Sequence, residues 1–199
     1  ISGADLPLRT KEEIFAYFDA HPGREYVHFA SLAPAESIRR RVAQYHFFTE
    51  KHRKSRFCRG LERLLGRVQS MLGVDRLQKS GLHLAFGAQW FSITDDLARY
   101  VLAEQKWIAR HFRVGDCADE LFLQTLVCNS PFFGRTYAAQ EGMPEGDYRA
   151  AARCIDWTRG QPYVWRSADF WELVESDFCF ARKFDWAVDA DIVRRIEAY

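Results

Sequence analysis

Charged side chains interrupt otherwise apolar segments in the last third of the chain. Glu120 precedes an apolar run, and Arg153, Arg182 and Lys183 flank apolar segments further along. A carboxylate can take the proton of a hydroxyl group that attacks one side of a reacting carbon. Separated cations can neutralise a phosphate that departs from the other side. We therefore expect Glu120 and the basic residues to face one cleft.

The spacing of apolar residues predicts the elements that carry these side chains. A helix is expected from about residue 118 to 127, with Asp119 as its cap. Residues 152–157 are typical of a strand. Ser167 and Asp189 are predicted to cap two further helices, the first through residue 174 and the second to the last residue.

The first two thirds of the chain also mix helical and strand patterns. Thr10 and Glu13 form a capping box at the start of a helix. The other expected elements are a strand at 25–29, helices at 35–50 and 57–72, a strand pair or a strand–bend–strand at 82–93, a helix capped by Thr94, a helix at 107–112 and an exposed loop at 134–149. The mixture predicts an α/β or α+β fold, and 199 residues suit one domain.

Composition excludes several classes of protein. The formal net charge of +1 argues against nucleic-acid binding, and no apolar run approaches the roughly 20 residues that span a bilayer. The five cysteines are scattered and odd in number, which is typical of reduced thiols in a cytoplasmic protein. Neither cysteines nor histidines have the spacing of zinc ligands.

Residues 51–67 are unusually basic on an amphipathic pattern. Their cations are Lys51, Arg53, Lys54, Arg56, Arg59, Arg63 and Arg67. The segment is interpreted as a solvated helix face, or as a peripheral contact with an anionic membrane surface. Nucleic-acid binding is the weaker third reading.

Several blocks in a fixed order resemble a known family. They are S-G-A-D-L-P-L-R-T, G-A-Q-W-F-S-I-T, D-E-L-F-L-Q-T-L-V-C-N-S-P-F, R-C-I-D-W and F-A-R-K-F-D. Together they look like the core-2/I-branching β-1,6-N-acetylglucosaminyltransferases, a family that includes peptide O-xylosyltransferases. The resemblance, to a member of bacterial type, implies a GT-A-like mixed sheet flanked by helices, a UDP-sugar donor and inversion at the anomeric carbon. It also implies that residues 1–199 are the C-terminal, catalytic and acceptor portion, lacking the first nucleotide-binding β/α units.

The resemblance assigns roles to the charged residues. Glu120 falls on the catalytic glutamate, for which the alternative is an acid favoured by a helix N-terminus. Arg153 and Lys183 match diphosphate-binding positions, with Arg182 beside them, although Arg182 and Lys183 could instead pair with Asp185 at the surface. The family uses basic side chains where related enzymes use a metal, so no metal or other cofactor is expected. The motif at 189–191 spells Asp-x-Asp but is interpreted as a helix cap.

Four further residues resemble positions around the sugar and the acceptor. Asp5 belongs to a block beside the acceptor site, or it caps the turn before Pro7. Gln89 and Trp90 match a block that lines donor sugar and acceptor, although some relatives have Asp at the position of Gln89. Trp157 is either a stacking platform or part of the core.

The leading hypothesis is therefore an inverting, metal-independent glycosyltransferase. It would move an N-acetylglucosamine-like sugar or xylose from a UDP-sugar to an acceptor hydroxyl group of a glycan or another molecule. The alternative is a non-catalytic domain that binds carbohydrate or a membrane surface.

Overall fold

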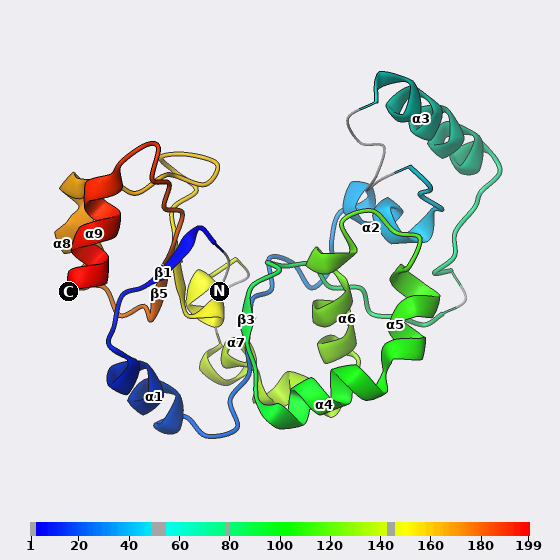
Figure 1. Ribbon diagram of the computed structural model, residues 1–199. Helices are drawn as coiled ribbons and strands as arrows, with labels where there is room; N and C mark the ends of the chain where they lie inside the picture. Colours follow the sequence, from blue (N-terminus) through cyan, green and yellow to red (C-terminus); the bar gives the residue numbers. More distant parts are fainter. Residues whose placement is uncertain (1–2, 49–54, 79, 143–145) are drawn as a thin grey trace. The chain divides into compact units, whose positions relative to one another are not determined.

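The computed structural model describes residues 3–48, 55–78, 80–142 and 146–199 (Figure 1). The chain forms two compact units. Unit 1 consists of Ile1–His28, Trp90–Thr94 and Arg135–Tyr199, and unit 2 consists of Phe29–Gln89 and Asp95–Gly134. The assignment of 1–199 to a single C-terminal portion of a larger enzyme stays a prediction.

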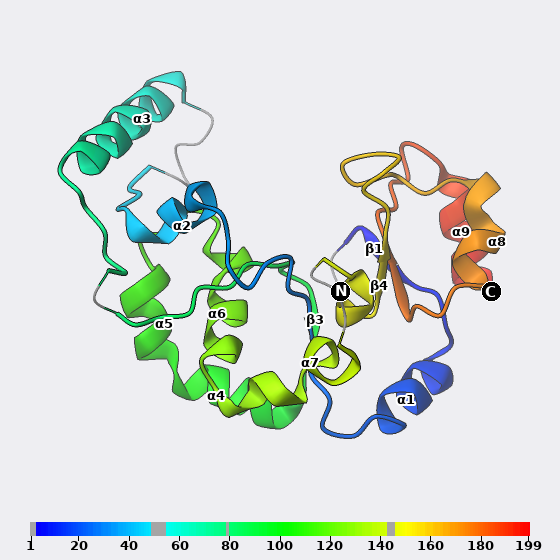
Figure 2. The same ribbon diagram turned by 180° about the vertical axis from the view of Figure 1, so that it is seen from behind.

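Unit 1 is built on a small mixed sheet. Its strands, in spatial order, are β1 (Asp5–Pro7), β5 (Phe180–Arg182) and β4 (Arg153–Ile155). β1 runs antiparallel to β5, whereas β4 runs parallel to it (Figures 1 and 2). The register places Asp5 opposite Arg182 and Arg153 opposite Phe180. The sheet thus brings together three segments that are distant in the sequence.

Two helices pack side by side against this sheet. They are α8 (Phe170–Val174) and α9 (Ala190–Ala198), and their apolar residues form a core with Leu8, Trp165 and Phe184 (Figure 2). Asp189 caps α9, as predicted, by accepting hydrogen bonds from the backbone N–H groups of Asp191 and Ile192.

The prediction that Ser167 caps a helix is wrong. Ser167 begins the 3-10 turn η4 (Ser167–Asp169) that precedes α8, and its hydroxyl group donates to the Asp189 carboxylate. The carboxylate of Asp169 accepts from the Arg166 backbone N–H instead. The same aspartate that caps α9 therefore also fixes this turn.

The remaining elements of unit 1 surround an aromatic cluster. They are α1 (Lys11–Asp19), the antiparallel strands β2 (Tyr26–Val27) and β3 (Phe91–Ser92), α7 (Tyr137–Glu141) and the 3-10 turn η3 (Tyr148–Ala151). The predicted capping box of Thr10 and Glu13 is present in α1. The strand expected at 25–29 is confirmed for Tyr26 and Val27.

The expected loop at 134–149 instead contains α7. Thr136 caps this helix through its side chain, and Gly142 closes it in the left-handed region with φ 61°. Tyr137 stacks on Tyr26, with 5.3 Å between ring centroids. The segment looks polar in sequence because one face packs while the other is solvated.

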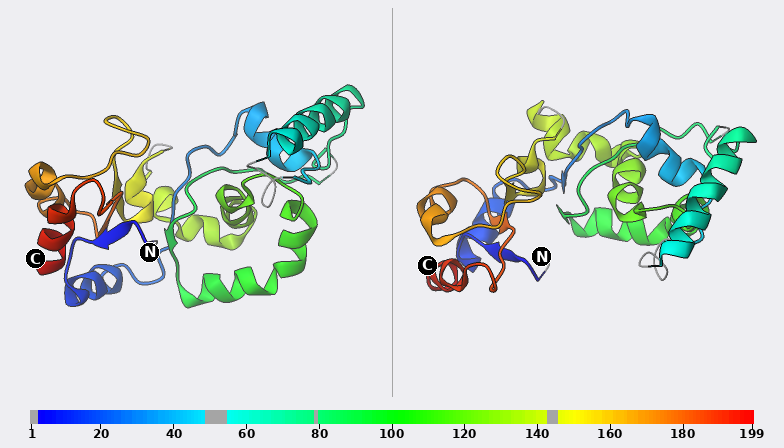
Figure 3. Two further views of the ribbon diagram at one scale, coloured as in Figure 1. Left: turned by 45° about the horizontal axis from the view of Figure 1, so that its top comes forward. Right: turned by 90° about the horizontal axis from the view of Figure 1, so that it is seen from above.

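Unit 2 is helical within the described residues. Its elements are α2 (Glu36–Ala43), α3 (Arg56–Met71), α4 (Asp95–Ala103), α5 (Gln105–Phe112), the 3-10 turn η1 (Ala118–Glu120), α6 (Phe122–Cys128) and the 3-10 turn η2 (Pro131–Arg135), whose last residue belongs to unit 1. α4 and α5 follow one another around α6 (Figures 1 and 3). The core joins Val42, Phe112 and Leu121, among others. Helices predicted at 57–72 and 107–112 are confirmed.

Three predicted elements of unit 2 differ in extent. The helix expected at 35–50 ends at Ala43, because Gln44 takes an extended backbone conformation. The helix expected at 118–127 is interrupted at Leu121, which separates η1 from α6. The strand pair expected at 82–93 is limited to β3 and one bridge between Ser31 and Phe86.

Side chains of α6 and its C-terminal end explain why residues 82–93 do not form a strand pair. The backbone N–H of His83 donates to the side chain of Asn129, and that of Ala85 donates to Thr125. Side chains of a helix thus satisfy backbone groups that a neighbouring strand would otherwise pair.

The fold class is a mixed α/β fold with a small mixed sheet and flanking helices, as predicted. Within the described residues, no helix combines the length and the apolar character needed to cross a membrane.

Candidate active site

Glu120 lies in unit 2, at the last position of η1 and just before α6 begins. Its backbone carbonyl accepts a hydrogen bond from the Gly87 N–H at 3.0 Å, which ties the turn to the G-A-Q-W-F-S-I-T block. Asp119 is exposed and does not occupy the cap of either helix, because those positions fall to Cys117 and Leu121. The interpretation of Asp119 as a cap is wrong.

Arg41 holds the Glu120 side chain. Its Nη1 donates to Oε2 of Glu120 at 2.9 Å, and each side chain is about one-third exposed. Ion pairs with that exposure contribute at most about 1 kcal/mol to stability. The pair therefore matters mainly because it orients the carboxylate.

A glycine makes this pair possible. The backbone of Gly115 passes close to the last turn of α2, where a Cβ at Gly115 would lie 3.0 Å from the Arg41 carbonyl oxygen. The next residue, Asp116, donates its backbone N–H to that same oxygen at 2.8 Å. The absence of a side chain at position 115 thus brings α2 against the turn that carries Glu120.

Glu120 also lines a cleft of about 1080 Å³ within unit 2. One wall is apolar and comes from α4 and α5, including Val101, Leu102 and Ile108. The other lining residues, from 113 to 122, include Arg113 and three carboxylates, one of them Glu120. The carboxylate of Glu120 is thus accessible from a space of substrate size.

The basic cluster lies in unit 1, around Asp5. Nη1 of Arg182 lies 2.7 Å from Oδ1 of Asp5, and Nε of Arg153 lies 3.4 Å from Oδ2. The side chains of Asp5, Arg153 and Arg182 are 0%, 2% and 18% exposed. The strand register explains this convergence, since Asp5 lies opposite Arg182 across β1 and β5.

Among the described residues, the cluster contains two arginines and one aspartate. Two guanidinium groups share the Asp5 carboxylate, and Arg153 also donates to the Ala151 carbonyl oxygen and lies over the Phe180 ring. Burial lowers the pKa of Arg153, with the nearby Arg182 adding to the effect, while Asp5 opposes it. A buried excess of cationic charge favours an anionic ligand.

Trp90 and Lys183 adjoin this cluster in different ways. The Trp90 ring lies 4.4 Å from the Arg182 guanidinium carbon, a cation–π contact. Lys183 follows Arg182 directly, and its backbone is held by Tyr163 and Trp165. Among the described residues, no carboxylate lies within ion-pair distance of the Lys183 ammonium group, Asp185 included. Arg182 pairs with Asp5, not with Asp185.

Trp157 and Gln89 are both exposed. Trp157 follows β4 in unit 1 and lies beside Tyr148, whose ring stacks on His28 at 4.1 Å. The reading of Trp157 as a core residue is therefore wrong, whereas its role as a platform stays a prediction. Gln89 belongs to unit 2, next to the boundary with Trp90.

In the Asp-x-Asp sequence at 189–191, the Asp189 carboxylate forms hydrogen bonds within the protein. Both oxygens of Asp189 accept hydrogen bonds from Ser167, and one also accepts from the backbone of α9. These bonds lower the pKa of Asp189 to about 2. In the part of the chain that the structure describes, no group of three or more His, Cys, Asp or Glu side chains is arranged to hold a metal ion.

The structure therefore brings Asp5, Trp90, Arg153 and Arg182 together in unit 1 and places Glu120 with Arg41 in unit 2. That both groups face one cleft stays a prediction. Arg41 and Tyr148 were not predicted from the sequence. Arg41 sits in the run Arg39-Arg40-Arg41, where nothing distinguishes one arginine from its neighbours.

A small mixed α/β scaffold with an accessible acid and a buried cationic cluster is typical of enzymes that transfer a group from an anionic donor. The sequence model of the Core-2/I-Branching enzyme family matches residues 1–178. The chain belongs to this family, and its members are glycosyltransferases, which take a nucleotide-sugar donor and a glycan acceptor. No curated protein matches the chain.

Proposed function

We propose that this glycosyltransferase moves an N-acetylglucosamine-like sugar or xylose from a UDP-sugar to an acceptor hydroxyl group with inversion. Basic side chains take the place of a metal at the diphosphate, and the reaction proceeds in the cytoplasm. The observation that carries the proposal is the buried cluster in which two arginines share one aspartate.

The cluster supports diphosphate binding through its charge and its surroundings. At a separation of 4 Å and an effective dielectric constant near 20, a pair of unit charges interacts with about 4 kcal/mol. Arg153 is fixed by Asp5 and by the Ala151 carbonyl oxygen, so its position needs little reorganisation when charge develops on the leaving group. Lys183 supplies a further cation beside Arg182, and the flexible ammonium group can reach a phosphate oxygen.

Glu120 acts as the general base. Its carboxylate takes the proton from the acceptor hydroxyl group as the hydroxyl oxygen bonds to the anomeric carbon. The bond from that carbon to the diphosphate oxygen breaks on the opposite face, and UDP leaves with the bonding electrons. Arg41 orients the carboxylate through the 2.9 Å contact.

The remaining residues position the donor and the acceptor. The Asp5 carboxylate is fully buried between two arginines, so we assign it a positioning role in place of direct contact with the acceptor. Trp90 holds Arg182 from one side and offers its ring to the sugar. Gln89 and the exposed Trp157 contribute a polar contact and a stacking surface for sugar rings.

The proposal is tested by UDP release from UDP-sugars with glycan acceptors, in the presence of a metal chelator. We expect turnover to be unchanged by the chelator. Glu120→Gln should lower kcat by roughly 10²–10⁴-fold, because a general base contributes that much. Glu104→Gln is the matched control, because Glu104 lies at the N-cap of α5, where its side chain makes no capping hydrogen bond, and the variant should retain activity. Loss of turnover with chelator, or full turnover in Glu120→Gln, contradicts the scheme.

Arg41→Gln tests the orienting contact. The variant loses the ion pair but retains a hydrogen-bond donor, so kcat should fall while the affinity for UDP is unchanged. Arg40→Gln is the control, because Arg40 pairs with Glu36 on the solvated side of α2. A fall in UDP affinity without a fall in kcat would assign Arg41 to the donor.

A further inference from the structure

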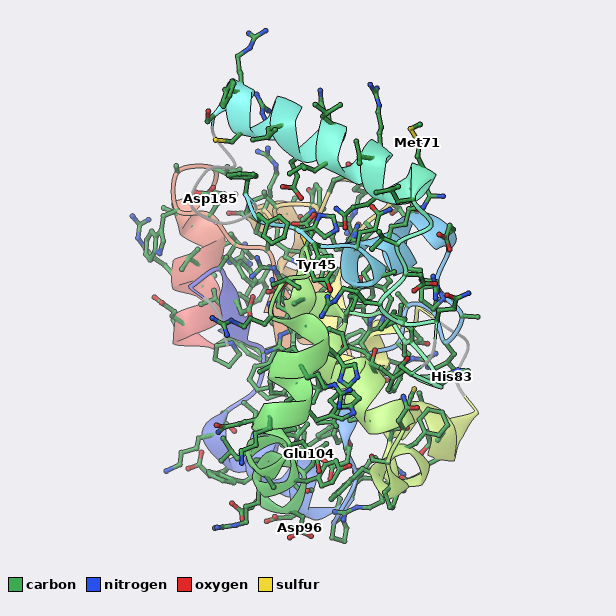
Figure 4. The ribbon with its side chains drawn as sticks, turned by 90° about the vertical axis from the view of Figure 1, so that its right-hand side faces the viewer. Tyr45, Met71, His83, Asp96, Glu104 and Asp185 are labelled. Carbon is green, nitrogen blue, oxygen red and sulfur yellow. The ribbon has the colours of Figure 1, made fainter. Side chains whose placement is uncertain are left out.

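Helix α3 exposes an apolar face. Phe57, Leu64 and Met71 are 78%, 56% and 86% exposed, and none of the residues of α3 is buried. Val68 and Leu72 add to the same stripe, since residues spaced by three or four share one side of a helix. Figure 4 shows Met71 pointing away from the rest of the molecule. Single exposed apolar residues are common on proteins, but a continuous stripe indicates an interaction surface.

A row of arginines runs along α3. Arg56 and Arg67 border the stripe and are exposed. Arg59 and Arg63 are also exposed, and they line a pocket with His46 and Glu62 on the side of α3 that faces the protein. Among the described residues, none of the four guanidinium groups lies within ion-pair distance of a carboxylate. The row thus presents positive charge that other side chains of unit 2 do not neutralise. Lys51, Arg53 and Lys54 of the same basic segment lie outside the described residues.

The polar side of α3 is the side that faces the protein. Oε1 of Glu62 lies 2.9 Å from Nδ1 of His46, and Gln69 exchanges hydrogen bonds with the backbone of Tyr45. Ser70 accepts a hydrogen bond from Gln44. A surface helix ordinarily packs its apolar face inward and leaves its polar face in water. α3 has the opposite orientation within unit 2.

We propose that α3 rests on an anionic lipid surface. Its apolar side chains enter the boundary between headgroups and acyl chains, and its arginines contact lipid phosphates. Charge complementarity selects this occupant. A symmetric contact with a second copy would place two identical arginine rows at one interface, where they repel each other. The inference adds a partner to the proposed transferase and holds whether or not the assigned catalytic residues are correct.

The test is co-sedimentation of the full chain with vesicles. One set contains phosphatidylcholine with phosphatidylglycerol, and the other contains phosphatidylcholine alone. We expect binding to the anionic vesicles, with affinity that falls as salt is added. Arg56→Gln together with Arg67→Gln should weaken partitioning roughly 30-fold, because each arginine near the surface contributes about 1 kcal/mol. Leu64→Ser together with Met71→Ser should weaken it by roughly tenfold or more.

Matched controls lie on other helices. Arg110→Gln removes an exposed arginine of α5, and Phe15→Ser removes an exposed aromatic residue of α1. Both should bind vesicles as the parent chain does. The proposal is overturned if anionic vesicles do not bind the chain, or if the controls weaken binding as much as the α3 variants do. It is also overturned if the chain is a dimer that the α3 variants dissociate, which would assign this face to a second copy.

Discussion

Asp5 pairs with Arg153 and Arg182, which are distant from it in sequence. The shared carboxylate compensates the positive charge of Arg153, which is buried. A guanidinium group that is 2% exposed has little access to water, so its charge depends on nearby acceptors. Arg153, which we propose as a diphosphate ligand, is therefore also part of the structural core of unit 1.

We expect Asp5→Asn to destabilise the protein. Removing one partner of a buried ion pair leaves the other charge uncompensated and costs about 3–5 kcal/mol in the free energy of unfolding. Denaturation by urea, followed by circular dichroism, measures the change. Asp177→Asn is the control, because Asp177 is exposed and should alter stability little. A cost below about 0.5 kcal/mol would show that the two arginines are stabilised without Asp5.

His28 makes the stability of unit 1 sensitive to pH. The ring is buried against Tyr148, and burial lowers the pKa of His28, although Gly146 and Asp147 oppose the shift. The unfolded chain therefore binds a proton at higher pH than the folded chain does. The contribution of the neutral His28 ring to the free energy of unfolding is fully present above the ordinary histidine pKa of about 6.5. This contribution is lost as the pH falls below that value.

The melting temperature should accordingly decrease between about pH 7 and pH 5. His28→Phe retains an aromatic ring against Tyr148 but cannot be protonated, so it should flatten this slope. His83→Gln, which changes an exposed histidine, should preserve it. Asp147 contributes at lower pH, because hydrogen bonds from Arg149 outweigh burial and lower the pKa of its carboxyl group. An unaltered slope in His28→Phe would assign the pH dependence to other groups.

At the scale of elements, the close approach of α2 to the turn at 115–120 determines the orientation of the Glu120 carboxylate. Gly115→Ala would place a Cβ 3.0 Å from the Arg41 carbonyl oxygen, so that backbone must shift. We expect a loss of stability of about 1–3 kcal/mol and a fall in kcat, since Arg41 and Glu120 would separate. Thermal unfolding and UDP release measure the two effects.

Gly60→Ala is the matched control for this substitution. Gly60 lies within α3, and a Cβ there would meet nothing within 4 Å. Alanine should stabilise the helix by about 0.5–1 kcal/mol without changing kcat. Equal kcat in Gly115→Ala and the parent chain would mean that the contact between α2 and the turn does not position Glu120.

Sequence patterns predicted the elements with strong local signals. The capping box of Thr10, the cap at Asp189 and the amphipathic helix α3 were correct because each depends on neighbouring residues alone. The strand pair predicted at 82–93 was wrong, because the side chains that bond to its backbone, Thr125 and Asn129, are about forty residues away in the sequence. The Asp5 cluster could not be derived from spacing for the same reason, and the resemblance to a family supplied those positions instead.

At the scale of the whole molecule, the two units divide the proposed chemistry. The candidate diphosphate ligands belong to unit 1, and the candidate base belongs to unit 2. Hydrogen exchange with and without UDP tests this division. We expect UDP to protect the amides of β4, β5 and their flanking residues, and to leave those of α4 and α5 unchanged. Protection confined to unit 2 would contradict the assignment of Arg153, Arg182 and Lys183.

Strand β1 has a consequence for how the protein is made. It pairs with β5, so Asp5 can form its ion pair only after Arg182 has been synthesised, 177 residues later. Every residue of unit 2 lies between these two strands in the sequence. During translation, the helical unit can therefore fold while the first strand is still unpaired, and the sheet of unit 1 forms last.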